Sequence, residues 1–292
     1  MKKKVIVAVA VLICCVTLGI VCICYWSYLT TCSRKIEIDE NLTTQSVLTF
    51  NVKCISDSDK DEYVWQNRAA LICDVLQDKT PSIICLQENK KEQYRFFKSF
   101  LKGYDSVATY RDSSALTECL PIFYRSDMYL LEQTQTFWLS DTPDVISNTW
   151  EGAYYRICTY VVLKNKITDK KFVVANTHLD YKSAEIQEKS IKLIYDRLSK
   201  LNLPTILTGD FNCRPNSNAI SIAKQHFTDV GKGFADENKG TINYFRSDYK
   251  DVKIDFMLQL NGSFVVDEYR VIDKKFDGAF PSDHFPIYAE IR

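Results

Sequence analysis

The fold is indicated by the stretch Pro204-Thr205-Ile206-Leu207-Thr208-Gly209-Asp210-Phe211-Asn212. Its first half is apolar and β-branched, which predicts a buried strand, and its end combines a permissive glycine with an acid and an amide. Alternate residues of an extended segment share a face, so Asp210 and Asn212 are expected to reach one bound group together. An Asx turn between strand and helix is the alternative interpretation.

The same pattern of an apolar run followed by a polar residue recurs along the chain. Residues 47–51 end in Asn51, the run 83–87 leads into Glu88, and 172–175 precedes Asn176-Thr177-His178. A hard cation such as Mg²⁺ takes oxygen ligands, so a carboxylate at a strand end is a candidate ligand. For Glu88 alone, a helix-start glutamate is the competing interpretation.

Two of the three histidines, His178 and His284, lie in short acid-flanked motifs, whereas His226 does not. Neighbours on a strand point to opposite faces, so a separate acid is expected to orient His284. Asp255, a carboxylate among apolar strand residues, is the candidate. A carboxylate-held imidazole removes a proton from water near neutral pH, which predicts a general-base pair.

The remaining pattern predicts one α/β domain over 47–292. Many strands with a few interspersed helices, rather than strict alternation, indicate a mixed sheet pair flanked by helices. Helices are predicted from Trp65 to the Thr80-Pro81 stop and over 91–101, 183–201 and 219–225. Strands are predicted over 47–51, 82–86, 106–110, 120–124, 155–163, 171–177, 204–208, 254–260, 264–271 and 285–291.

The N-terminus predicts a membrane anchor. Residues 5–28 carry no charge and are long enough to cross a bilayer core of about 30 Å. Lysines at positions 2–4 favour a cytoplasmic N-terminus (1–4), a transmembrane signal anchor (5–28), a linker (29–46) and an extracytoplasmic catalytic domain. The apolar run is longer than that of a cleaved signal peptide.

Cysteine usage and charge exclude some classes of protein. Of 11 cysteines, four lie in the apolar run and the others are widely spaced without a CxxC pair, which argues against a zinc ribbon. An extracytoplasmic location would permit one or two disulfides. The 37 basic and 37 acidic side chains give no global basic field of the kind that marks nucleic-acid binders.

Six motifs, taken in order, resemble the endonuclease/exonuclease/phosphatase superfamily, and two further segments, Pro121-Ile122-Phe123-Tyr124-Arg125 and Phe137-Trp138-Leu139-Ser140, resemble a bacterial branch of it. The six motifs are Leu48-Thr49-Phe50-Asn51, Leu86-Gln87-Glu88, Asn176-Thr177-His178-Leu179-Asp180, Gly209-Asp210-Phe211-Asn212, Ile254-Asp255-Phe256 and Ser282-Asp283-His284. The likeness spans nearly all of 47–292. It implies a four-layer α/β sandwich, two mixed sheets covered by helices, with the site at one sheet edge.

The resemblance also implies Mg²⁺ or Mn²⁺ and attack of water on a phosphate ester. Glu88 would be the main metal ligand, assisted by Asn51 and Asp283, while Asp210 and Asn212 would position the nucleophile or phosphate. His284 with Asp255 would activate water, and His178 would stabilise the transition state or assist the leaving group. The formal base, Asp210 or His284, and the number of metal ions stay open.

Arg156 and a basic helix face are candidate substrate contacts. The planar fork of Arg156 suits phosphate, although an ordinary strand arginine is the alternative. Lys91, Arg95 and Lys98 fall on one face of a predicted helix beside Glu88. They would steer a polyanion or simply form its solvated side.

These features predict a membrane-anchored, metal-dependent phosphodiesterase of nuclease-like type. Its substrate would be a nucleic acid, a phospholipid headgroup or a small phosphate ester, and no protein partner is inferred. A sphingomyelinase-like phospholipid phosphodiesterase is one alternative. A catalytically silent anchored binding module of the same fold is the other.

Overall fold

The computed structural model describes residues 31, 33–39, 41, 43–249, 252–260 and 262–292. Within these residues, no helix has the length and apolar character needed to cross a membrane. The predicted anchor over 5–28 lies outside the described residues.

The first sheet brings the two ends of the domain together. Its strand order is β13-β14-β1-β2-β6-β4, with β1 and β2 parallel and the other neighbours antiparallel. The strands are β1 (Ser46–Asn51), β2 (Ile83–Gln87), β4 (Tyr104–Val107), β6 (Ile122–Arg125), β13 (Val266–Val271) and β14 (Ile287–Ile291). Every β1 residue is buried, so β1 forms the centre of this sheet.

The second sheet has the order β11-β12-β10-β9-β8-β7. Here β9 and β10 are parallel, and β8 with β9 form the predicted antiparallel hairpin. The strands are β7 (Tyr129–Trp138), β8 (Ile157–Asn165), β9 (Lys171–His178), β10 (Thr205–Asp210), β11 (Phe227–Asp229) and β12 (Asp255–Leu260). A short ribbon joins β3 (Asn89–Lys90) to β5 (Glu118–Cys119).

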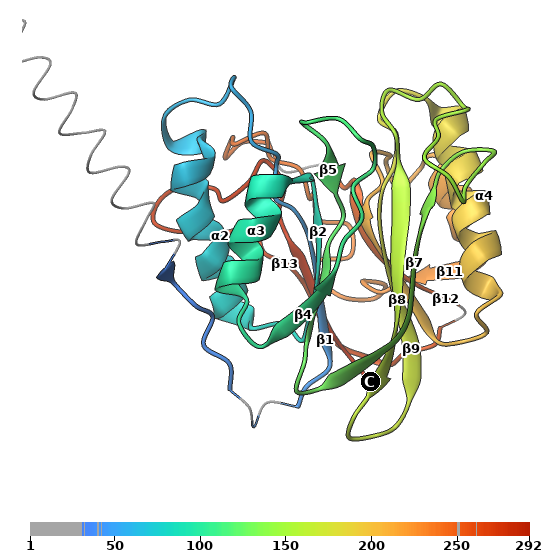
Figure 1. The fold of residues 1–292 in the computed structure, drawn as a ribbon, viewed down its shortest axis with the longest axis horizontal. Helices are drawn as coiled ribbons and strands as arrows, with labels where there is room; N and C mark the ends of the chain where they lie inside the picture. Colours follow the sequence, from blue (N-terminus) through green and yellow to red (C-terminus); the bar gives the residue numbers. More distant parts are fainter. Residues whose placement is uncertain (1–30, 32, 40, 42, 250–251, 261) are drawn as a thin grey trace, which may run out of the picture.

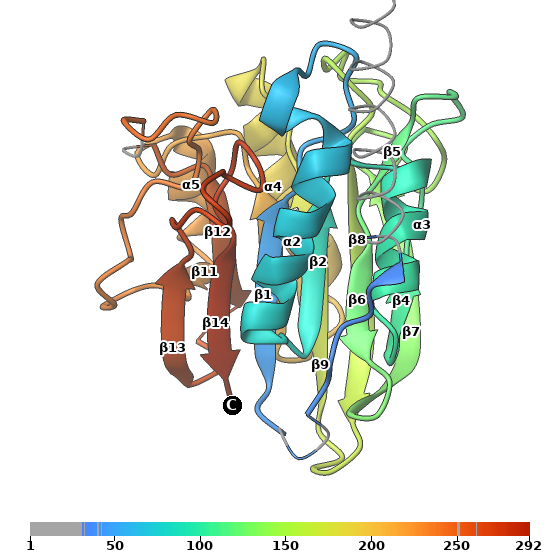
Figure 2. The same cartoon turned by 90° about the vertical axis from the view of Figure 1, so that its left-hand side faces the viewer.

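The two sheets stack face to face between two layers of helices (Figures 1 and 2). Helices α2 (Trp65–Lys79) and α3 (Lys91–Phe100) cover the first sheet, and α4 (Ala184–Ser199) with α5 (Asn218–Ala223) cover the second. A 3₁₀ turn, η1 (Asp61–Tyr63), precedes α2. One apolar cluster fills the space between the sheets and one lies under each helix layer. This is the expected α/β architecture with two mixed six-stranded sheets.

Local signals account for the helix ends. Ser183 caps α4 as predicted, because its hydroxyl accepts a hydrogen bond from the N–H of Ile186. Helix α2 stops at Thr80, which takes a left-handed conformation before Pro81. Strand β11 and the ribbon of β3 and β5 were not predicted, since strands of two or three residues carry almost no periodic signal.

Part of the predicted linker lies against the domain. Ile36 is buried and its N–H donates to the carbonyl of Phe100 at 2.9 Å, while Arg34 pairs with Asp74 at 2.6 Å. The segment therefore contacts α2 and α3. Each of the six cysteines in the described part of the domain is free, so none of them forms a disulfide there.

Candidate active site

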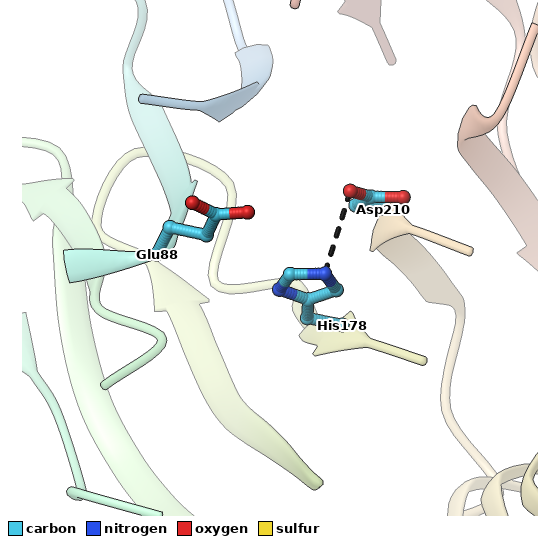
Figure 3. Close-up of side chains that lie close together, drawn as sticks. All are labelled: Glu88, His178 and Asp210. Atoms are coloured by element: carbon cyan, nitrogen blue, oxygen red, sulfur yellow. Dashed lines mark ion pairs between the residues drawn. The ribbon is translucent and has the colours of Figure 1, made fainter. Parts of the chain in front are cut away.

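The predicted site residues come from strand ends of both sheets. Parallel neighbours end at the same edge, so β1 and β2 deliver Asn51 and Glu88, and β9 and β10 deliver His178 and Asp210. Asp255 opens β12, which is antiparallel to β10 and opposite Asp210 in register. Figure 3 shows Glu88 facing His178 and Asp210, which come from the other sheet.

One amide connects the two sheets at this edge. The Nδ2 of Asn51 donates to Glu88 Oε1 and to Asp210 Oδ2, each at 3.0 Å. Its Oδ1 accepts from the N–H of Lys53 at 3.0 Å, which holds the amide in this orientation. In this arrangement, the amide nitrogen of Asn51 rather than its oxygen faces the two carboxylates.

Glu88 is held as an anion. Its φ is +61°, which turns the chain sharply after β2, and its Oε2 accepts from the N–H of Cys54 at 3.0 Å. Burial alone would raise the pKa of Glu88, but the hydrogen bonds from the Cys54 N–H and the Asn51 amide, together with the positive charge of His284, hold it below its ordinary value. The carboxylate is thus charged at any physiological pH.

Asp255 and His284 form the expected pair. Asp255 Oδ2 lies 2.9 Å from His284 Nδ1, and both side chains are almost fully buried. Burial opposes a charge on His284, but the charge and hydrogen bond of Asp255 outweigh it and raise the pKa of the imidazole well above its ordinary value. With Nδ1–H donated to Asp255, Nε2 is directed to Asp210 Oδ2, 3.8 Å away.

The backbone around His284 differs from the expectation. Residues 281–283 form a bend, and His284 makes only an isolated bridge to Ile242. The different directions of the Asp283 and His284 side chains therefore result from the bend and not from strand alternation. The predicted strand over 285–291 begins later, at Ile287, because Pro286 cannot donate to the ladder.

Asp210 combines the two roles that the sequence left as alternatives, a place in the site and an Asx turn. Its Oδ1 accepts from the N–H of Asn212 at 2.8 Å, which is an Asx turn, while its Oδ2 stays in the cluster. Asn212 has a φ of +50°, so it is not extended, and Phe211 is fully buried as expected. Burial and the charge of Asp255 raise the pKa of Asp210 to about 7.

Gly209 permits the close approach of β10 to β9. Its φ is +144°, and a Cβ at this position would lie 1.9 Å from the carbonyl oxygen of Thr177. No side chain fits there, so the glycine sets the distance between the two strands that carry Asp210 and His178.

His178 and Asn212 contact each other. Asn212 Nδ2 lies 2.9 Å from His178 Nε2 and donates to the carbonyl of Leu179 at 3.1 Å. His178 Nε2 is also 3.4 Å from Asp210 Oδ2. Burial and the charge of Arg156 lower the pKa of His178 well below its ordinary value, so the imidazole is neutral.

Asp283 and Arg156 lie at the margins of the cluster. Asp283 Oδ2 is 3.8 Å from the ammonium of Lys53. Burial raises the pKa of Asp283, and Lys53 partly offsets this rise. Arg156 precedes β8 and is buried rather than exposed, which differs from an ordinary surface arginine. His226 lies elsewhere and stacks on Tyr195.

The residues present suit a hard divalent cation. Ligand atoms of Glu88, His178 and Asp210 lie within 4.8 Å of one another, as do those of Asp210, Asp255 and His284. Carboxylate oxygens dominate both groups, and Mg²⁺ or Mn²⁺ prefers such donors. The donor set therefore fits the predicted kind of metal site, with Asp210 common to both groups.

The side chains that hold the site residues in position were not predicted from the sequence. Arg68 is fully buried and donates to the carbonyls of Val52 at 2.7 Å and Pro281 at 3.2 Å, which ties together the loops after β1 and before β14. A charged residue beside the apolar face of α2 was the available signal. Asn176 Oδ1 accepts from Gln87 Nε2 at 2.7 Å, which connects the sheets beneath Glu88 and His178.

Comparisons with known proteins agree with this geometry. A sequence model described as the endonuclease/exonuclease/phosphatase family matches residues 48–284. An uncharacterized protein of Acanthamoeba polyphaga mimivirus is 30% identical over 192 residues, which are 62% of this chain and 71% of that protein.

Two further relatives carry names for their activities. The solved structure of a mannosyl-6-phosphatase from Bacteroides thetaiotaomicron is 29% identical, with a TM-score of 0.79, and the match covers 85% of this chain and 100% of that one. A 3'-5'-exoribonuclease subunit of the CCR4-Not complex from Emericella nidulans is 26% identical over 191 residues. That match covers 54% of this chain and 27% of the exoribonuclease.

Proposed function

This chain belongs to the endonuclease/exonuclease/phosphatase family, and on that premise we propose that it is a divalent-metal-dependent phosphodiesterase. The single observation that supports the proposal most is the buried Asp255–His284 pair beside Asp210 and Glu88. An oriented imidazole and two further carboxylates in one cluster have no use in a purely structural role. A binder of the same fold would not need them together.

In the proposed reaction, His284 in its neutral form accepts a proton at Nε2 from the attacking water, and Asp255 stabilises the imidazolium that forms. Because the pKa of His284 is raised, this role requires a pH at which the imidazole has lost its proton. Asp210 and Asn212 position the water or the phosphate. Asp210, with a pKa of about 7, is the competing candidate for the formal base. His178, which is neutral, donates a hydrogen bond to the phosphate as negative charge develops.

The metal ion would be Mg²⁺ or Mn²⁺, held chiefly by Glu88 with Asp283 and Asn51 nearby. Once bound, it would neutralise charge on the phosphate oxygens. For Asn51 to supply its oxygen, the amide must turn over and give up the hydrogen bond from Lys53. If the Asn51 amide does not rotate, Asn51 contributes to the metal site only indirectly, by holding Glu88 and Asp210 in position.

A phosphomonoester is the second candidate substrate. The likeness to a mannosyl-6-phosphatase extends over that protein's whole length, whereas the likeness to an exoribonuclease subunit covers about a quarter of it. Phospholipid headgroups remain a third class because of the proposed anchor.

The test is a substrate panel with Mg²⁺, Mn²⁺ and EDTA arms. It compares bis-p-nitrophenyl phosphate, p-nitrophenyl phosphate, mannose 6-phosphate, single-stranded DNA and RNA, and sphingomyelin vesicles. We expect metal-dependent turnover of the diesters that is abolished by His284→Ala and by Glu88→Ala. Turnover of monoesters alone would favour the second candidate, and an equally active His284→Ala protein would refute the mechanism.

We also propose that residues 5–28 anchor the protein in a membrane with the catalytic domain outside the cytoplasm. The support is the uncharged apolar run after three lysines. Protease treatment of intact cells tests it, since an external domain is digested without lysis. A domain protected from protease until lysis would contradict the orientation.

A further inference from the structure

A lysine ammonium lies between two carboxylates beside the candidate active site, and the reaction proposed above does not use it. Lys53 Nζ is 3.6 Å from Asp59 Oδ1 and 3.8 Å from Asp283 Oδ2. Asp59 belongs to the loop between β1 and η1, whereas Asp283 belongs to the loop before β14. The ammonium therefore lies where two loops from opposite ends of the domain meet.

The backbone of Lys53 is held in an uncommon conformation. Its φ is +53°, in the left-handed region that residues with a Cβ seldom adopt. Three hydrogen bonds fix it there: the N–H donates to Asn51 Oδ1 at 3.0 Å, and the carbonyl accepts from Arg68 Nη2 at 3.1 Å and Gln93 Nε2 at 2.9 Å. Strain that the surrounding structure maintains in this way is common at functional sites. The position of the Lys53 side chain is thus set by the fold.

Asp283 faces this lysine rather than the other candidate ligands. Its carboxylate belongs to neither of the two groups of ligand atoms described above. Its Oδ1 accepts a hydrogen bond from the hydroxyl of Ser282 at 3.2 Å, and its Oδ2 is directed to Lys53. The resemblance implied that Asp283 assists the metal ion, but the cation beside this carboxylate is the ammonium.

Asp59 is a buried acid that depends on a nearby cation. Its side chain is 7% exposed, and its Oδ2 has no hydrogen-bond partner among the described residues. The positive groups of Lys53 and Arg68 lie 3.6 and 4.0 Å from its two oxygens. A buried carboxylate with so few hydrogen bonds is unfavourable unless a cation compensates its charge. Without the ammonium, Asp59 and Asp283 together would offer the oxygen ligands that a divalent ion prefers.

We propose that the ammonium of Lys53 is a built-in cation that takes the place of a second metal ion, so that the protein binds one divalent ion, beside Glu88. This inference rests on the proposed function, because the single ion is the one that the proposed hydrolysis requires. A second ion between Asp59 and Asp283 would have to displace the ammonium, which is attached to the chain and carries a positive charge at neutral pH. An ammonium attracts phosphate oxygens as a point charge, but it does not activate a bound water as a metal ion does. The attacking water therefore depends on a protein base.

The group of ligand atoms around Asp255 does not supply a second metal position either. Asp255 Oδ2 and His284 Nδ1 share a 2.9 Å hydrogen bond, so each atom already has its partner. Among the described residues, the remaining group is the one formed by Glu88, His178 and Asp210. The geometry therefore provides for one divalent ion together with one fixed ammonium.

The number of bound Mn²⁺ ions tests this role. Paramagnetic resonance of free Mn²⁺, with calorimetry, counts the ions on the full chain in detergent. We expect about one ion for wild type and Lys53→Arg, about two for Lys53→Met, and about one again when Lys53→Met is combined with Asp59→Asn. The matched control is Lys239→Met, because Lys239 also lies between two acids, Asp236 at 3.6 Å and Asp273 at 2.9 Å, that do not belong to the metal-binding cluster. This control should keep the count of wild type.

Thermal unfolding separates this role from a purely structural ion pair. Lys53→Met leaves two acids without their cation, so Mn²⁺ should raise its Tm more than that of wild type. Two Mn²⁺ ions on wild type would overturn the proposal whatever the variants do, as would a folded Lys53→Met protein with the count and Tm response of wild type. The expected counts without hydrolysis of any ester by wild type would support the built-in cation and refute the proposed function. Hydrolysis by a wild type that binds two ions would do the reverse.

Discussion

Replacing Asp255 with asparagine should lower the pKa of His284 and slow turnover while leaving the fold intact. The two side chains share a buried 2.9 Å hydrogen bond. A hydrogen bond to a charged group contributes roughly 1.5–3 kcal/mol. Since one pKa unit corresponds to about 1.4 kcal/mol, the His284 pKa should fall by about 1 to 2 units in the metal-free protein.

The assay is an NMR titration of the imidazole signals in EDTA. The chain has three histidines, and His226, stacked on Tyr195 with ring centroids 3.6 Å apart, serves as an internal reference. Asp267→Asn, at an exposed acid that pairs with Arg292, is the matched control. An unchanged His284 pKa in Asp255→Asn would refute the role of Asp255 as its orienting partner.

The Asp255–His284 pair also makes the stability of the fold depend on pH. The pKa of His284 is higher in the folded protein than in the unfolded chain, so the protonated imidazole stabilises the fold. This stabilisation is fully present below the unfolded pKa of about 6.5 and is lost as the pH rises through the pKa of the folded protein. The Tm of Asp255→Asn should therefore vary less with pH above about 6.5 than that of wild type.

The same substitution should slow catalysis. A loss of about 2–3 kcal/mol of transition-state stabilisation in Asp255→Asn corresponds to a roughly 30- to 150-fold lower kcat.

Three further perturbations test the supports of the site. Glu88→Gln should weaken Mn²⁺ binding at least about 100-fold by calorimetry, because the main anionic ligand is lost; equal affinity would contradict its role. Gly209→Ala places a Cβ 1.9 Å from the carbonyl oxygen of Thr177, so urea unfolding should show a loss of at least about 3 kcal/mol, and a loss below about 1 kcal/mol would contradict the close approach. Asn176→Leu should cost about 2–3 kcal/mol, because it removes the acceptor of the Gln87 amide and the donor to the carbonyls of Leu86 and Pro121. Adding Gln87→Met should recover the part that is due to the Gln87 amide, and strict additivity in the cycle would argue against the cross-sheet bond.

The strand ends of this site are predictable from sequence because each couples an apolar run to a polar residue. Glu88 follows a buried strand, His178 and Asp210 are the last residues of theirs, and the structure brings the three together. The Asp255–His284 contact was also expected, although the reason given for it, strand alternation around His284, was wrong. A bend containing Pro281 positions this histidine.

The supports could not be predicted because they depend on contacts between distant parts of the chain. The bond between Gln87 and Asn176 joins positions 89 residues apart, and no local period reports it. Arg68 binds the carbonyl of Pro281 across 213 residues. The buried Nε of Arg156, which has no hydrogen-bond partner among the described residues, likewise cannot be predicted from sequence, because it depends on burial.

The place of β14 in the first sheet has a consequence during synthesis. Strand β1, the first of the domain, lies between β2 and β14, the last. The loop carrying Asp283 and His284 immediately precedes β14, so the central strand acquires its second neighbour and the site acquires His284 at the same late stage. A ribosome-bound chain that stops short of this loop has Glu88, His178 and Asp210 but lacks the Asp255–His284 pair, so hydrolysis that uses His284 as the base requires this loop to have been synthesised.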